Sequence, residues 1–123
     1  MISAKTILTV DDSQTMRDML LYALEGEGFR VIQATDGLEG LEALRADPPD
    51  VIITDINMPN LDGFGFIEQV RQDARFRATP ILVLTTESEQ DRKDRARKAG
   101  ASGWIVKPFN TAKLVEAIRR VAA

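Results

Sequence analysis

Short apolar runs alternate with amphipathic segments five times along the 123 residues of this chain. The runs have the length of strands, and in the segments between them apolar residues recur three or four positions apart, as in helices. The second run spans Phe29 to Ala34, and the fourth helical segment spans Glu89 to Ala99 and ends at Gly100. This alternation predicts an α/β fold with a doubly wound parallel sheet, because parallel strands need helical crossovers.

Polar residues mark where the helices begin. Asp36 and Asn110 have side chains that favour the N-cap position, and they precede the second and the last helix. In the second helix we expect Leu38, Leu41 and Leu44 to share the buried face.

Composition excludes several classes of function. The net charge of −3 gives no reason to expect nucleic-acid binding. The chain has no cysteine and no histidine, so thiolate metal sites are excluded and any phosphohistidine must come from a partner. No signal peptide is visible, and no apolar stretch approaches the roughly 20 residues of a membrane span. We expect a cytoplasmic monomer with no membrane contact, and one domain over residues 1–123 without an effector domain.

Four of the apolar runs end in polar residues of different types. The first run ends at Asp11 and Asp12, the third at Asp55, the fourth at Thr85 and the last at Lys107. The carboxyl ends of parallel strands share one edge of the sheet, where ligands bind in such folds. Three carboxylates, a hydroxyl group and a cation are therefore expected to meet there.

The three acids predict a site for a hard divalent cation. Neighbouring carboxylates repel one another and raise each other's pKa, and a cation relieves this repulsion. Mg²⁺ prefers oxygen ligands, whereas zinc usually recruits histidine or cysteine. With the metal bound, Asp55 can act as a nucleophile toward phosphorus and form an aspartyl phosphate. Lys107 supplies the positive charge that a transferring phosphoryl group needs.

Each of these residues also has a plainer interpretation. Asp11 or Asp12 is of the type that caps a helix, although Ser13 is a competent cap that leaves both carboxylates free. Lys107 would be an ordinary surface lysine, except that it follows a strand expected to be buried and precedes Pro108. A cis Lys107–Pro108 bond would aim its ammonium group over the sheet edge.

Four motifs together resemble the receiver domain of two-component response regulators, over essentially the whole chain. They are Val10-Asp11-Asp12-Ser13, Thr54-Asp55-Ile56-Asn57-Met58-Pro59 followed by Asp62-Gly63, Leu84-Thr85-Thr86, and Val106-Lys107-Pro108-Phe109. Each is weak alone, but all four in order are highly specific. The chain is most similar to stand-alone chemotaxis regulators of the CheY type. The resemblance implies a flavodoxin-like (βα)5 fold with five parallel strands in the order 2-1-3-4-5.

The resemblance also implies roles for the acidic residues. Asp55 matches the phosphoacceptor. Asp12 matches the direct acidic Mg²⁺ ligand, and Asp11 matches the acid that helps through water. The backbone carbonyl of Asn57 matches the group that completes the metal shell, and Asn57 and Glu87 flank the site at positions that affect phosphate loss.

Three further residues match family positions that respond to the phosphoryl group. Lys107 pairs with it, and Thr85 swings to bond one of its oxygens. Trp104 stands where the family usually has tyrosine or phenylalanine, the aromatic residue whose rotamer reports activation. Tryptophan is larger than either, so the alternative is a side chain fixed in a surface patch.

The fourth helix departs from an ordinary amphipathic pattern. From Ser88 to Lys98 its only apolar residue is Ala96. We expect the least anchored helix of the fold, stabilised by spaced charges such as the pair Asp91–Arg95. In the family this helix belongs to the output face, which would here be charged.

These observations predict a phosphorylation-activated signalling switch and not an enzyme. A sensor histidine kinase or phosphotransfer protein would donate the phosphoryl group, and the domain would assist its own phosphorylation and dephosphorylation. The resemblance also implies a downstream protein partner, such as the flagellar motor switch in chemotaxis. The alternatives are a single-domain phosphorelay shuttle, a receiver that works without phosphorylation, and an aspartate-nucleophile Mg²⁺ phosphatase. The D-x-D-x-[TV] motif of such phosphatases is not matched at residues 11–15.

Overall fold

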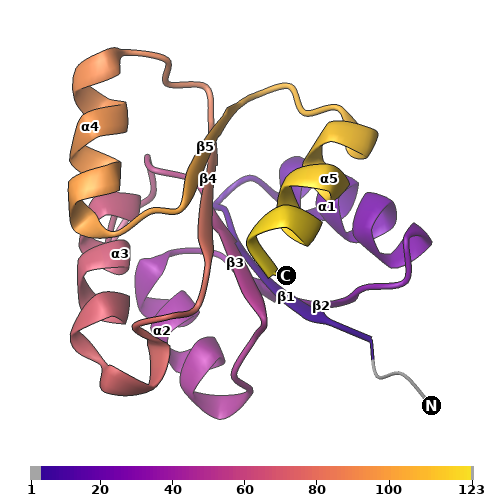
Figure 1. The fold of residues 1–123 in the computed structure, drawn as a ribbon, viewed down its shortest axis with the longest axis horizontal. Helices are drawn as coiled ribbons and strands as arrows, with labels where there is room; N and C mark the ends of the chain where they lie inside the picture. Colours follow the sequence, from indigo (N-terminus) through magenta and orange to yellow (C-terminus); the bar gives the residue numbers. More distant parts are fainter. Residues whose placement is uncertain (1–3, 123) are drawn as a thin grey trace.

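Residues 4–122, which the computed structural model describes, form one five-stranded parallel sheet with helices on both faces (Figure 1). The strands are β1 (Thr6–Val10), β2 (Arg30–Ala34), β3 (Val51–Thr54), β4 (Ile81–Thr85) and β5 (Gly103–Val106). The helices are α1 (Gln14–Gly26), α2 (Gly37–Ala46), α3 (Gly63–Gln72), α4 (Gln90–Ala99) and α5 (Thr111–Ala122), with the short 3₁₀ helix η1 (Ala74–Phe76). The strand order is β2-β1-β3-β4-β5, which confirms the expected fold.

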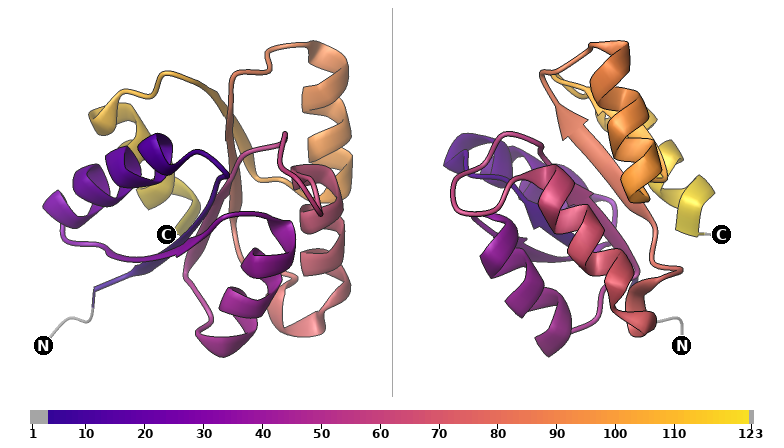
Figure 2. Two further views of the ribbon diagram at one scale, coloured as in Figure 1. Left: turned by 180° about the vertical axis from the view of Figure 1, so that it is seen from behind. Right: turned by 90° about the vertical axis from the view of Figure 1, so that its left-hand side faces the viewer.

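Two hydrophobic clusters lie on opposite faces of the sheet. Helices α1 and α5 cover one face, and α2, α3 and α4 cover the other (Figure 2). Successive residues of β3 serve different clusters, since Ile52 packs on the α2–α4 side and Ile53 on the α1–α5 side. All residues of β3 and β4 are buried, as expected for strands covered on both faces.

The predicted helix caps are confirmed. The Ser13 hydroxyl accepts a hydrogen bond from the Met16 amide at the start of α1, which leaves Asp11 and Asp12 free of capping. Asp36 caps α2 through its carboxylate, and the Asn110 side chain accepts from the backbone amide at the start of α5.

The buried face of α2 differs from the expectation. Leu41 and Leu44 are buried, but Leu38 is 51% exposed. The buried positions are Gly37, Gly40, Leu41 and Leu44, which follow the i, i+3, i+4, i+7 pattern of one helical face. Leu38 follows Gly37 by one residue, so it lies about 100° around the helix from the start of that face.

Strand β5 is less buried than expected. It lies at the edge of the sheet and pairs only with β4 among the strands of residues 4–122. Its four residues are half-buried or exposed, and Val106 is 40% exposed. Lys107 therefore follows an edge strand and not a buried one. The Lys107–Pro108 peptide bond is cis, which is the isomer that the sequence left as one possibility.

Helix α4 is held by polar contacts, but not by the predicted pair. Ala96 is its one buried residue within Gln90–Ala99. The spaced ion pair found in α4 is Asp94–Arg97 at 3.3 Å and not Asp91–Arg95. The Arg95 guanidinium instead lies over the Phe64 ring of α3, 4.0 Å from the ring centroid. The Arg–aromatic contact covers apolar surface as well as charge, which an exposed pair with Asp91 would not do.

Candidate functional site

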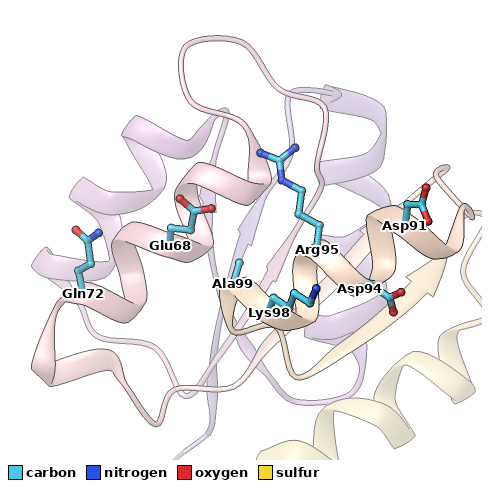
Figure 3. A pocket seen from close by; sticks show the side chains of 7 residues that line it. All are labelled: Glu68, Gln72, Asp91, Asp94, Arg95, Lys98 and Ala99. Carbon is cyan, nitrogen blue, oxygen red and sulfur yellow. The ribbon is translucent and has the colours of Figure 1, made fainter.

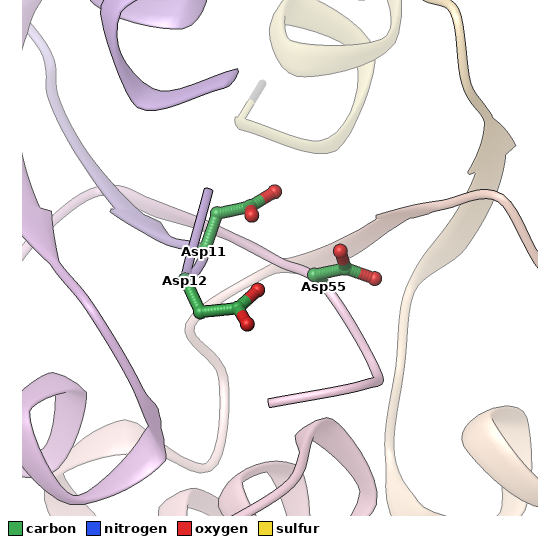
Figure 4. Close-up of side chains that lie close together, drawn as sticks. All are labelled: Asp11, Asp12 and Asp55. Carbon is green, nitrogen blue, oxygen red and sulfur yellow. The ribbon is translucent and has the colours of Figure 1, made fainter. Parts of the chain in front are cut away.

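Asp11, Asp12 and Asp55 meet at the carboxyl ends of β1 and β3 (Figure 4). The two strands are neighbours in register, and the Asp55 amide donates to the Val10 carbonyl at 2.9 Å. One carboxylate oxygen from each acid lies within 4.8 Å of the others. Asp11 and Asp55 are buried and Asp12 is exposed, so the cluster opens to solvent on the side of Asp12.

Lys107 joins this cluster from the end of β5. Its ammonium nitrogen lies 2.9 Å from Asp11 Oδ2 and 2.8 Å from Asp55 Oδ2, and its side chain is 11% exposed. The predicted convergence of acids and cation at one edge is therefore present. The contact between Lys107 and Asp11 was not anticipated from the sequence.

Burial and charge act in opposite directions on the pKa values of this cluster. Burial raises the pKa of Asp11 above its ordinary value, although the Ser13 amide and Lys107 oppose the rise. Burial alone would lower the pKa of Lys107, but hydrogen bonds to Asp55 and Asp11 outweigh it and raise that pKa. Lys107 therefore stays charged between the two carboxylates at neutral pH.

Thr85 ends β4 at the same edge of the sheet. It is buried, and its hydroxyl oxygen accepts a long hydrogen bond of 3.4 Å from the Glu87 amide. Its carbonyl accepts from the Lys107 amide at 2.8 Å. Thr85 thus connects the end of β4 to the lysine that pairs with Asp55.

Glu87 links several parts of the site. Its carboxylate accepts a hydrogen bond from the Asn57 side-chain amide at 3.0 Å and lies 3.5 Å from the Arg92 guanidinium. Its carbonyl accepts from the Trp104 indole N–H at 3.0 Å. Trp104 is half-buried and packs against the core cluster of the α2–α4 face. The sequence does not single out Arg92 as a site residue, because it is one of several charged residues of α4.

The donor set of the acidic cluster fits Mg²⁺. It consists of carboxylate oxygens near one another, and the chain contains no histidine or cysteine that would favour a softer metal. The residues placed to hold the ion are Asp11, Asp12 and Asp55. The Asn57 side chain is engaged with Glu87, and its backbone carbonyl stays a predicted ligand.

A separate groove runs between α3 and α4 (Figure 3). It is lined by Glu68, Gln72, Asp91, Asp94, Arg95, Lys98 and Ala99. It shares no residue with the acidic cluster and carries charges of both signs. Within residues 4–122 no helix is long and apolar enough to cross a membrane.

The fold and the acidic edge define a class of protein. The chain belongs to the response regulator receiver domain family, whose sequence profile matches residues 7–119. Members of this family act in phosphorylation-dependent signalling in two-component systems and are not classical enzymes.

Among its relatives are chemotaxis proteins. The chain is 40% identical over 117 residues to chemotaxis protein CheY1 of Helicobacter pylori, with 94% of each chain covered. It is 37% identical to CheY-3 of Vibrio cholerae, over 94% of this chain and 89% of the relative. The structure of V. cholerae CheY4 superposes with a TM-score of 0.93 at 41% identity, covering 97% of this chain and 99% of the other.

A receiver domain with bound metal has the same fold. The receiver domain of sensor histidine kinase PA1611 from Pseudomonas aeruginosa has Mg²⁺ coordinated in its active-site cleft. It matches 98% of each chain at 27% identity with a TM-score of 0.90.

Proposed function

We propose that this chain is a signalling switch that accepts a phosphoryl group on Asp55. The observation that carries the proposal is the position of Asp55, whose carboxylate is bonded to Lys107 and adjoins two further acids. A carboxylate held between a fixed cation and a candidate metal site is suited to attack phosphorus.

The transfer uses residues of this chain and a partner's histidine. An Asp55 carboxylate oxygen forms a bond to phosphorus as the P–N bond of the partner's phosphohistidine breaks, and the imidazole leaves with the electron pair. Lys107 moves its hydrogen bonds from the carboxylate to the phosphoryl oxygens. A bound Mg²⁺, held by Asp11, Asp12, Asp55 and the Asn57 carbonyl, would neutralise negative charge during transfer.

The switch acts through Thr85 and Trp104. Thr85 turns its hydroxyl group toward the phosphoryl group. This rotation breaks the hydrogen bond that the Thr85 hydroxyl oxygen accepts from the Glu87 amide. The loop after β4 then shifts, together with the Trp104 indole that bonds to the Glu87 carbonyl. The new bonds stabilise one arrangement of α4 and β5 over another, and this population shift changes affinity for a target.

We infer the partners from the relatives. A sensor histidine kinase or phosphotransfer protein is the donor, and similarity to chemotaxis regulators points to a downstream target such as the flagellar motor switch in the cytoplasm. Because the chain contains no histidine, the phosphoryl group must come from a phosphohistidine of a partner protein or from a small acyl phosphate.

Intact-mass measurement tests the proposal. With Mg²⁺ and a small phosphodonor the wild-type chain should gain one phosphoryl group, and Asp55→Asn should gain none. Asp50→Asn, with the same charge change at an acid that bonds the Thr6 amide, is the control and should still be labelled. An unlabelled wild type, or equal labelling of Asp55→Asn, would overturn it.

A further inference from the structure

A chain of side chains connects α4 to the loop that carries Asp55. Arg92, in the first turn of α4, approaches one oxygen of the Glu87 carboxylate at 3.5 Å, and the Asn57 amide donates to the other oxygen at 3.0 Å. Asn57 is two residues beyond Asp55. The Glu87 carboxylate is thus shared between a helix of the output face and the loop of the phosphoacceptor.

The Glu87 carboxylate needs a nearby positive charge to stay in this position. It is joined through Asn57 to the loop that bears the buried Asp55, which lies beside Asp11 and Asp12, and phosphorylation would add more negative charge. Among residues 4–122, Arg92 is the cation paired with Glu87, whereas Lys107 is engaged by Asp11 and Asp55. Without Arg92, repulsion would favour a Glu87 side chain turned toward solvent and away from Asn57.

We propose that Arg92 is a positioning residue that sets the lifetime of the phosphorylated state through Glu87 and Asn57. This inference rests on the proposed phosphorylation of Asp55. Because Arg92 belongs to α4, any partner or movement that repositions this helix also changes how Glu87 is held. A partner that binds α4 would therefore also change the lifetime of the phosphorylated state.

The step that Arg92 affects is hydrolysis. The oxygen of water forms a bond to phosphorus as the bond between phosphorus and the Asp55 oxygen breaks. The carboxylate leaves with the electron pair, and the proton of water passes to solvent as inorganic phosphate is released. Glu87 and Asn57 are bonded to each other next to the Asp55 loop. In this proposal the bonded pair shields the phosphoryl group from water, so releasing the pair speeds this step.

The variant Arg92→Gln tests the proposal against two controls. Arg92→Lys keeps the charge, and Arg97→Gln makes the same charge change on the same helix at a residue that pairs with Asp94 instead. Each protein is labelled with Mg²⁺ and a small phosphodonor, the donor is removed, and the phosphoryl group is followed by intact mass. Arg92→Gln should lose the phosphoryl group about threefold faster than wild type, in line with the strength of an exposed ion pair. Both controls should lose it at a rate within about 1.5-fold of the wild-type rate.

Fluorescence of metal-free protein gives a readout apart from phosphorylation. The sole tryptophan, Trp104, bonds to the Glu87 carbonyl, so its emission should shift in Arg92→Gln and not in Arg97→Gln. Equal lifetimes of wild type and Arg92→Gln, equal acceleration in Arg97→Gln, or an unshifted emission in Arg92→Gln would each overturn the role of Arg92. If wild type is never labelled, the proposed function itself fails, and this inference with it.

Discussion

Lys107 is the residue on which the charge balance of the site depends. It lies between two buried carboxylates, and its hydrogen bonds to both raise its pKa against the effect of burial. Removing one partner from a buried ion pair leaves uncompensated charge behind, which costs more than the pair itself contributes. The lysine therefore stabilises the protein before any phosphorylation, in addition to the role toward the phosphoryl group that we propose for it.

We predict that Lys107→Met lowers the free energy of unfolding by about 2 kcal/mol, less than in a closed core because the cluster opens to solvent. Urea unfolding at neutral pH measures this loss. Mg²⁺ should restore stability more in this variant than in wild type, since a cation would again face the acids. Lys113→Met, the same change at an exposed residue of α5, should cost little. Equal losses in the two variants would contradict the account.

Asp12 is the exposed member of the acidic cluster. We predict that Mg²⁺ raises the thermal unfolding midpoint of wild type and that Asp12→Asn weakens metal binding at least about tenfold. The stabilisation at a fixed, near-saturating Mg²⁺ concentration would then fall by about 1.4 kcal/mol. Asp18→Asn, on the exposed side of α1, should respond to Mg²⁺ as wild type does. A full response from Asp12→Asn would remove Asp12 from the metal site.

Residue-scale prediction succeeded where a residue ends a strand. The positions of Asp11, Asp55 and Lys107 alone predicted that they share one edge, because the carboxyl ends of parallel strands meet there. The direct bond between Lys107 and Asp11 within that edge was not predicted. The link between Arg92 and Glu87 was not foreseeable, since both carry long side chains in a segment rich in charge. Nothing in the local pattern says which charges pair.

At the scale of elements, α4 has the fewest buried residues of the five α-helices described within residues 4–122. It buries Ala96 alone within Gln90–Ala99, whereas α3 buries five residues. The stacking of Arg95 on Phe64 is one of its contacts with α3. A helix with few buried contacts opens more readily, which agrees with the movement of α4 that we propose.

We predict that backbone amides of α4 exchange with deuterium faster than those of α3. Arg95→Ala should increase exchange across α4 further, because a partly exposed cation–π contact contributes about 0.5–1 kcal/mol. Arg97→Ala, which loses only an exposed ion pair with Asp94, should change it less. Slower exchange in α4 than in α3 would show that α4 is well anchored after all.

Arg71 ties the end of α4 to the rest of that face. Its guanidinium donates to the carbonyls of Gly100, Phe76 and Thr79 at 2.7–3.1 Å. Gly100 has a φ of 121°, which favours glycine, and a Cβ there would lie 2.7 Å from Arg71. The sequence predicted the role of Gly100 as the helix end but gave no sign of Arg71, whose partners are distant in the chain.

We predict that Arg71→Lys destabilises the fold by about 2 kcal/mol, because one ammonium group cannot replace a planar fork that serves three carbonyls. Chemical denaturation measures the loss. Arg75→Lys, at an exposed residue that pairs with Asp73, should cost less than about 0.5 kcal/mol. Similar values for the two variants would mean that the three carbonyls are satisfied without Arg71.

At the scale of the whole molecule, the sheet separates two cores and places the chemistry at one edge. The alternation of strands and helices predicts these layers from the sequence, because β3 and β4 are apolar up to their final threonine. The strand order came from resemblance to the family and was confirmed. The burial of β5 was overestimated, since a short apolar run does not reveal whether its strand lies at the centre or at the edge of a sheet.

In the proposed switch, Asp55 and no other acid of the cluster carries the phosphoryl group. Reduction of the phosphorylated protein with borohydride converts an acyl phosphate to an alcohol, so that the labelled aspartate becomes homoserine. Peptide mass spectrometry then identifies its position. We predict homoserine at position 55 alone, and only when Mg²⁺ is present during labelling. Homoserine at position 11 or 12, or at none of the three, would contradict it.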